Sequence, residues 1–420
     1  MNTHTLAPTA SQPDSSWKRR WRRFAVVAGP GLVVMLADTD AGSVITAAQS
    51  GAQWGYRLLL LQLVLVPILF VVQELTVRLG IVSGMGHGAL IQRHFGRFWA
   101  WISVGTLALA CGGALLSELS GLAGVGLLFG VPAWISMPAV VGGLILMVLT
   151  RSYLSVERIA LAIGAFELVF VVVALRAHPD GHAMLAGSLA IPWSDTQYLY
   201  LAAANVGAVI MPWMVFYQQS SVVEKGLQLG DLRAARWDTA IGAVLTQVIM
   251  AAVLVAVAAA LSNNGAGQTL DTVQQIAGAI TPVLGQGTGR LLFALGMSGA
   301  ALVATIVVAL TAARSVGEVL GVHHSLDLAL HEAPWFYGIF AAVLGGAGLV
   351  VACDVNLVSL SVGVQVMNAL LLPVVLGFLY LLARRLPEPH RLSGAYAWVV
   401  GATIAVTAGF GVYAGIAGIL

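Results

Sequence analysis

Residues 25–51 read AVVAGPGLVVMLADTDAGSVITAAQSG, an apolar run long enough to cross a membrane that carries Asp38 and Asp40 near its middle. A charged side chain at the centre of a bilayer costs several kcal/mol, so such a residue usually faces a cavity and binds something. Gly42 follows two residues later, and glycine weakens a helix. The stretch therefore predicts a membrane helix that is broken at mid-depth and that brings a carboxylate to a buried site.

A second apolar run is interrupted in a similar way. Residues 200–221 read YLAAANVGAVIMPWMVFYQQSS, with Pro212 at the centre and Asn205, Gln218 and Gln219 around it. Broken helices in corresponding positions of two halves point to the substrate site of inverted-repeat transporters, and these breaks lie about 170 residues apart. The pair predicts two repeats that meet at a substrate site. The alternative is a pair of Gly and Pro kinks beside a buried aspartate that is satisfied by hydrogen bonds.

The composition of the whole chain predicts a membrane protein. Of its 420 residues, 59% are hydrophobic and 9% are charged, and the mean hydropathy is +0.91, far from the values of a soluble globular protein. We expect an all-α integral membrane protein with eleven spans of roughly 20 residues each. The expected spans are 24–51, 57–80, 98–121, 132–150, 155–176, 197–221, 236–262, 287–313, 335–352, 355–383 and 395–418.

The basic residues indicate how these spans are oriented. With the N-terminus inside, only Arg57, Arg176 and Arg290 of the 20 Lys and Arg residues fall on the outer side, as the basic character of cytoplasmic loops requires. We therefore predict a multi-pass protein of a bacterial-type inner membrane with a cytoplasmic N-terminus. The predicted parts are a disordered basic tail at 1–23 and one transport domain at 24–420, with repeats at 24–176 and 197–383 and an added helix at 395–418.

The motifs at the two breaks resemble those of the Nramp family of proton-coupled Mn²⁺ and Fe²⁺ transporters. The family motif Asp-Pro-Gly-Asn falls on residues 40–43, read DAGS, and Ala-x-x-Met-Pro-His falls on residues 208–213, read AVIMPW. The resemblance covers nearly the whole chain and includes QELTVRLGIVSG at 73–84, LLFGVPAW at 127–134 and LLFALGMSGAALVAT at 291–305. It implies a LeuT-like inverted repeat of five plus five helices. The forms of both motifs look more like the Nramp-related magnesium transporter branch.

The resemblance implies a metal site formed by Asp40, Ser43, Ala208 and Met211. Residue chemistry supports part of this set independently, because a hard dication prefers oxygen donors such as the Asp40 carboxylate, the Ser43 hydroxyl and freed backbone carbonyls. The Met211 thioether is a softer donor that would favour transition metals if it faces the ion; a mid-span methionine is otherwise a packing residue. Asp38 lies two residues before Asp40, and we expect it to support the site or to act through water.

The departures from the family pattern concern proton coupling. Trp213 stands where the family carries His, and Ala114 and Ser117 stand where helix three carries two acids, although a shift of one residue would bring Glu118 onto the second position. We expect all nine histidines to lie in the tail or in loops, which leaves no imidazole relay in the membrane. Transport is therefore expected to be weakly coupled or uncoupled to protons, with Glu118 as the candidate for a proton route.

Polar residues of the tenth span are candidates for a gate. Gln365 falls on a family Gln, and Asn368 lies one helical turn later, so both could close over an ion together with Trp213. Besides Glu118, the acids that remain for a proton route near or within spans are Glu74, Glu167 and Glu318, and the favoured interpretation of each is instead a salt-bridged or interfacial residue.

Together these features predict a secondary transporter that moves Mn²⁺, Mg²⁺ or both into the cytoplasm by alternating access. An alternative is a carrier of an amino acid or another organic solute, because one architecture serves many substrates; two aspartates at the break favour a cation. An enzyme is not expected, because the spans contain no nucleophile motif or phosphate-binding loop. The expected partners are the metal substrate and membrane lipid, with no cofactor, nucleic acid or obligate protein partner.

Overall fold

The computed structural model describes residues 27–149, 153–261, 267–321, 328, 330–353 and 357–419, and its elements are helices. The predicted tail at 1–23 lies outside the described residues. The first half contains α2 (Pro30–Asp38), α3 (Ala41–Trp54), α4 (Leu59–Ser83), α5 (His87–Phe95), α6 (Arg97–Leu128), α7 (Ala133–Val148), α8 (Tyr153–Gly164), η1 (Ala165–Leu168), α9 (Val169–Arg176) and α10 (Gly181–Leu189). The second half contains α11 (Thr196–Val209), α12 (Pro212–Glu224), η2 (Leu229–Asp231), α13 (Leu232–Leu261), α14 (Val273–Leu284), α15 (Gln286–Leu320), α16 (Pro334–Ala352), α17 (Leu357–Ala383) and α18 (Gly394–Ile419).

The predicted all-helical membrane architecture is confirmed, whereas the count of eleven spans is not. Within the described residues, nine helical segments are long and apolar enough to cross a membrane alone, and α2 with α3 forms a tenth. The expected fourth span is α7, which has only 16 residues. At 1.5 Å per residue it is about 24 Å long, shorter than a hydrocarbon core of about 30 Å. Helices α6 and α15 continue beyond the predicted span ends at 121 and 313, to Leu128 and Leu320.

The first span breaks at Thr39 and Asp40, as the sequence predicts. The axes of α2 and α3 differ by 47°. Asp40 takes an extended conformation and caps α3, because its side chain accepts a hydrogen bond from the Ser43 amide. The other end of this span is also fixed, since the Asp238 carboxylate of α13 accepts hydrogen bonds from the Gly29 and Gly31 amides at the start of α2. The break is therefore an ordered feature held from both sides.

The sixth span breaks at Ile210 and Met211, between α11 and α12. Pro212 is the first residue of α12 and has no N–H, so α11 cannot continue its hydrogen-bond ladder through this position. Met211 is in an extended conformation and precedes the proline as the N-cap residue. The predicted second break is thus confirmed at the motif that contains Pro212.

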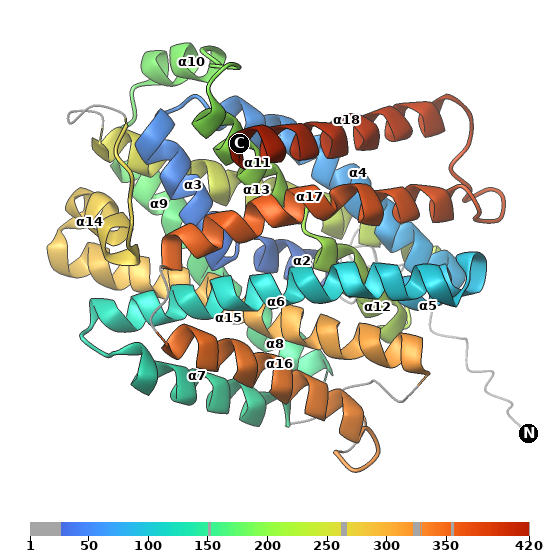
Figure 1. Cartoon of the computed structure of the whole chain (residues 1–420). Coiled ribbons are helices and arrows are strands. Elements are labelled where there is room, and N and C mark those ends of the chain that lie inside the picture. Colours follow the sequence, from blue (N-terminus) through green and yellow to red (C-terminus); the bar gives the residue numbers. More distant parts are fainter. Residues whose placement is uncertain are drawn as a thin grey trace, which may run out of the picture.

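The two broken spans lie among the other helices of the bundle. The first span packs against α13, and α11 packs against α17 and α18, while α6 packs along α15. Gly207 of α11 faces α17 so closely that a Cβ there would overlap the Gln365 carbonyl. In Figure 1, α7 and α16 lie together at one edge of the bundle, and α14 and α5 lie at opposite ends. The breaks are therefore surrounded by protein.

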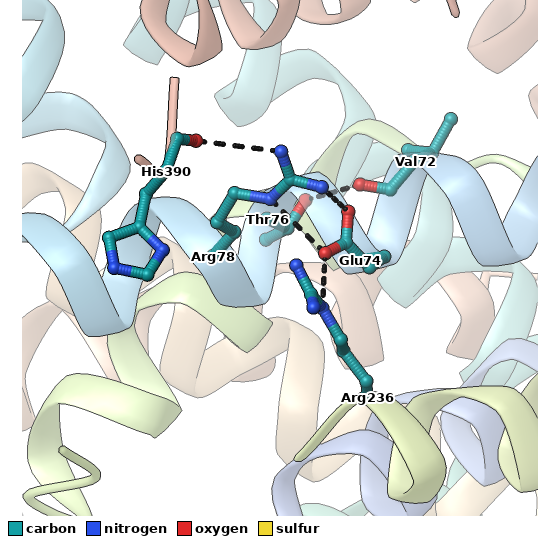
Figure 2. A network of polar contacts seen from close by, with 6 residues as sticks. All are labelled: Val72, Glu74, Thr76, Arg78, Arg236 and His390. Carbon is teal, nitrogen blue, oxygen red and sulfur yellow. Dashed lines mark hydrogen bonds and ion pairs between the residues drawn. The ribbon is translucent and has the colours of Figure 1, made fainter. Parts of the chain in front are cut away.

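A polar network ties the end of α4 to α13. Figure 2 shows the Glu74 carboxylate between two guanidinium groups: Arg78 Nη2 lies 2.6 Å from one carboxylate oxygen and Arg236 Nε lies 2.7 Å from the other. Arg78 Nη1 also donates to the His390 carbonyl at 3.5 Å. Of the two interpretations that the sequence allowed for Glu74, the salt-bridged one is confirmed.

Candidate metal-binding site at the two helix breaks

The Asp40 carboxylate lies at the centre of the first break. It is fully buried, and its Oδ1 accepts a hydrogen bond from the Ser43 amide at 2.6 Å. Oδ2 has no hydrogen-bond partner in the described part of the chain, although the Glu118 and Gln365 side chains lie beside the carboxyl. One carboxylate oxygen is thus used to cap α3 and the other is available to a cation.

Ser43 connects the first break to the second. Its hydroxyl donates a hydrogen bond to the Ala208 carbonyl at 3.1 Å. That carbonyl is free because its helical partner, four residues later, is Pro212, which has no N–H to offer. The proline therefore exposes a backbone oxygen beside Asp40, as the motif implies for Ala208.

Helix α6 contributes Ser117 and Glu118 to the same place. Glu118 Oε2 accepts a hydrogen bond from the Ala41 amide at 2.9 Å, so this carboxylate satisfies an amide in the first turn of α3. A Cβ on Gly42 would come within 2.6 Å of the Ser117 hydroxyl. Both residues therefore reach the first break.

Helix α17 closes the site with an amide pair. Asn368 Nδ2 donates to Gln365 Oε1 at 2.9 Å, and both side chains are fully buried. A Cβ on Gly42 would overlap the Gln365 amide nitrogen, so Gly42 is required for this close approach. The two residues predicted as a gate thus lie together, and Gln365 lies next to the first turn of α3.

Met211 and Trp213 flank Pro212 at the second break, and both side chains are fully buried in the apolar core. Asp38 points elsewhere: its Oδ2 accepts from the Thr246 hydroxyl of α13 at 3.4 Å. The described residues contain no group of three or more His, Cys, Asp and Glu side chains that could hold a metal ion. A cation beside Asp40 would therefore need hydroxyl, amide, carbonyl or water oxygens, or the Met211 thioether, in addition to carboxylates.

The histidine prediction is wrong in one consequential case. His87, His94 and His182 lie in helices α5 and α10 and not in loops. His87 is fully buried, because α5 folds back against α12, where its Nδ1 lies 2.8 Å from Gln219 Oε1 and its ring meets the Phe216 edge at a centroid distance of 4.8 Å. Burial lowers the pKa of His87 to about 4, although the Gln219 hydrogen bond opposes this shift.

Sequence reasoning gave too little weight to two residues. Asp238 anchors the start of α2, and Glu167 lies fully buried beside Thr39. An isolated acid within an apolar run was the signal available for Glu167, whereas Asp238 lies two residues after Arg236 at the start of such a run.

Comparisons with known proteins agree with this architecture. The sequence profile of the Nramp family, described as natural resistance-associated macrophage protein-like, matches residues 31–417. A divalent metal cation transporter MntH of Mesorhizobium japonicum is 30% identical over 321 residues, which cover 72% of this chain and 69% of the relative. A transporter of the same name from Klebsiella pneumoniae is 29% identical over 311 residues, which cover 71% and 74%.

Solved structures show the same fold. A manganese transporter of Eremococcus coleocola superposes with a TM-score of 0.73 at 19% identity, covering 99% of this chain and 92% of the other. A nucleobase-cation-symport-1 family transporter reaches a TM-score of 0.58 at 15% identity, covering 93% and 90%. The predicted fold class is therefore confirmed, and the alternative of an organic-solute carrier is not favoured by the sequence relatives.

Proposed function

The chain belongs to the Nramp family, and from this premise we propose that it carries divalent metal cations, Mn²⁺, Mg²⁺ or both, into the cytoplasm by alternating access. Relatives that are named divalent metal cation transporters support the substrate class. The protein acts as a transporter and not as an enzyme, and it needs no cofactor or obligate protein partner. It lies in a bacterial-type inner membrane with its N-terminus in the cytoplasm.

The observation that carries this proposal is the buried Asp40 carboxylate with one oxygen left free at the break. The ligands in the proposed site are Asp40, the Ser43 hydroxyl, the Ala208 carbonyl and the Met211 thioether. The Ser43 hydroxyl already lies against the Ala208 carbonyl, so a small rearrangement around an entering ion can bring both oxygens to it. Gln365 and Asn368 of α17 close over the ion together with Trp213.

The donor set supports either metal. Three of the four proposed ligands offer oxygen, which suits Mg²⁺ and Mn²⁺, whereas a thioether contributes only to softer ions. We place the chain in the magnesium-transporting branch, because residues 38–42 read DTDAG and residues 212–226 read PWMVFYQQSSVVEKG. Met211 adjusts the preference for Mn²⁺ over Mg²⁺ in this proposal and does not define the site.

Transport in this proposal is weakly coupled or uncoupled to protons. Trp213, Ala114 and Ser117 cannot titrate, and one oxygen of the Glu118 carboxylate is engaged by the Ala41 amide at the start of α3. The membrane potential alone drives a dication inward, with about 2.3 kcal/mol per charge for each 100 mV. Uptake therefore needs no proton gradient.

Uptake into proteoliposomes tests the function. Purified protein is reconstituted with an internal metal indicator, an inside-negative potassium diffusion potential is imposed, and Mn²⁺, Mg²⁺ or radiolabelled amino acids are added outside. We expect saturable uptake of at least one of the two cations above that of protein-free liposomes. Amino-acid uptake without any metal uptake would contradict the proposal and support the organic-solute alternative.

A further inference from the structure

Glu167 is a buried carboxylate that the site described above does not use. It lies in η1, the 3-10 segment that interrupts the fifth span between α8 and α9. Its exposed fraction is 0%, and neither of its side-chain oxygens has a hydrogen-bond partner in the described part of the chain. A buried polar group without a partner carries a desolvation cost, and for an ionised carboxylate this cost is large. Such a group is neutralised either by a proton or by a cation bound beside it.

Three further side chains that carry oxygen lie around the first break. Thr39 lies beside Glu167, and Thr246 lies between Thr39 and Asp38. The Thr39 hydroxyl is close enough to Glu167 to hydrogen-bond it, and the Leu36 carbonyl, 3.1 Å away, competes for its single hydrogen. The Thr246 hydroxyl lies 3.4 Å from Asp38 Oδ2 and 3.5 Å from Thr39 Oγ1. The two hydroxyl groups therefore connect the two carboxylates into one buried cluster of oxygens.

The charge of this cluster is not compensated by the surrounding protein. Asp38 Oδ1 has no partner, and in the described ranges neither Asp38 nor Glu167 makes an ion pair with Lys, Arg or His. The two carboxylates also repel each other, and Asp40 adds to the repulsion on both. Two carboxyl groups at this depth are neutralised either by two protons or by one divalent cation.

We infer that Asp38, Glu167, Thr39 and Thr246 form a second cation site, which takes a hard divalent cation through oxygen atoms alone. A divalent ion neutralises both carboxylates, whereas an alkali ion would leave one charge uncompensated in a medium of low dielectric. Mg²⁺ is commonly held by one or two carboxylates while it keeps several waters, and the hydroxyls of Thr39 and Thr246 are placed to receive such waters. No sulfur donor is part of the cluster.

The two sites are formed by different halves of the broken first span. Asp38 ends α2 and Asp40 caps α3, so the second site lies on the α2 side of the break and the first site on the α3 side. The inference rests on the proposed transport of divalent cations, and it adds a second position for the cargo. Because ions in adjacent sites repel one another, occupancy of the second site is expected to speed release of the ion from the first.

Counting bound ions tests this inference. Full-length protein in detergent is titrated with Mn²⁺, whose free concentration is read by electron paramagnetic resonance, and with Mg²⁺ as competitor. We expect two Mn²⁺ ions per chain in the native protein and one in Glu167→Gln. Glu388→Gln is the control, because Glu388 lies in an exposed pair with Arg391, and it should retain two. A native stoichiometry of one, or two ions in Glu167→Gln, would overturn the second site.

Two further variants separate this inference from the proposed function. Asp40→Ala should lose the ion of the first site and retain the ion of the second site, which is the one that Glu167→Gln removes. If Asp40→Ala binds two ions and transports normally, the first site is wrong. Thr246→Val removes only a hydroxyl and serves if Glu167→Gln fails to fold. It should weaken the second ion by roughly tenfold, in the range found for groups that support a metal ligand, and unchanged affinity would contradict the site. Displacement of one Mn²⁺ by millimolar Na⁺ would refute the divalent assignment.

Discussion

The Ser43 hydroxyl donates a hydrogen bond to the Ala208 carbonyl at 3.1 Å, and this contact joins two broken spans across 165 residues of sequence. The carbonyl is free because Pro212 follows four residues later. A backbone oxygen and a hydroxyl thereby meet beside the free oxygen of Asp40. An entering ion can coordinate both oxygens in place of this hydrogen bond. Ion binding is therefore coupled to the relative position of α3 and α11.

Met211→Ala tests whether the thioether reaches the ion. We expect Mn²⁺ uptake to weaken relative to Mg²⁺ by about tenfold, equal to about 1.4 kcal/mol, because a soft donor contributes more to Mn²⁺. Competition between the two ions in proteoliposomes measures the ratio. Met214→Ala is the matched control, since Met214 is also fully buried in α12. An unchanged ratio in Met211→Ala would mean that Met211 only packs.

Glu118 decides the question of proton coupling. We expect no metal-dependent acidification inside liposomes that contain a pH-sensitive dye and an imposed potassium diffusion potential, because Glu118 accepts a hydrogen bond from the Ala41 amide at the start of α3. Metal uptake measured in the same liposomes is the control that shows the reconstituted protein is active. Acidification that disappears in Glu118→Gln would refute the uncoupled mechanism. The glutamine retains an oxygen that can accept from the Ala41 amide, so this variant should still fold.

The breaks could be predicted from the sequence because their causes are local. Asp40 is a good N-cap residue, and Pro212 cannot donate to a helix, so both features act within a few residues. The role of Glu118 could not be predicted in the same way. Its contact with the Ala41 amide depends on how α6 packs against α3, and a shift of one residue in the alignment moved it into or out of the site.

His87 makes the protein less stable in mild acid. Its pKa in the folded state is about 4 because the ring is buried, whereas an unfolded histidine titrates near 6.5. The contribution of the neutral His87 ring to the free energy of unfolding is complete above about pH 6.5. It is lost as the pH falls toward 4, since the unfolded chain then binds a proton that the folded protein excludes. At pH 5 the loss is about 2 kcal/mol.

Melting temperatures at pH 7.5 and pH 5 measure this effect in detergent. His87→Asn has no titrating ring, so its melting temperature should fall less between the two values than that of the native protein. His182→Asn, at the exposed start of α10, should behave like the native protein. Equal falls in the native protein and in His87→Asn would show that other groups cause the acid sensitivity.

Glu74 stabilises the end of α4 through its two arginine partners. Glu74→Ala leaves the buried Arg78 without a carboxylate, and breaking a buried pair costs about 3 kcal/mol or more. We expect a clear drop in melting temperature. Glu388→Ala removes an exposed ion pair with Arg391, for which about 0 to 1 kcal/mol is usual. A similar melting temperature in both variants would contradict the structural role of Glu74.

The burial of His87 and Glu167 also lay beyond the sequence, and for the same physical reason. Whether a short segment such as α5 folds back against α12 depends on contacts between helices that are distant along the chain. The sequence places His87 between two apolar runs, which is typical of a loop. Glu167 appeared as one of several acids near spans, and only the packing around η1 distinguishes it from the salt-bridged Glu74.

Asp40→Asn tests the central claim that the Asp40 carboxylate binds the cargo. Asparagine is also a good N-cap, so α3 should keep its cap and the protein its melting temperature, while the negative charge is lost. Asp180→Asn is the matched control, because Asp180 caps α10 on the surface in the same way. Initial rates of Mn²⁺ and Mg²⁺ uptake into proteoliposomes should fall to those of protein-free liposomes in Asp40→Asn and remain unchanged in Asp180→Asn. Uptake by a well-folded Asp40→Asn protein at the native rate would contradict the account.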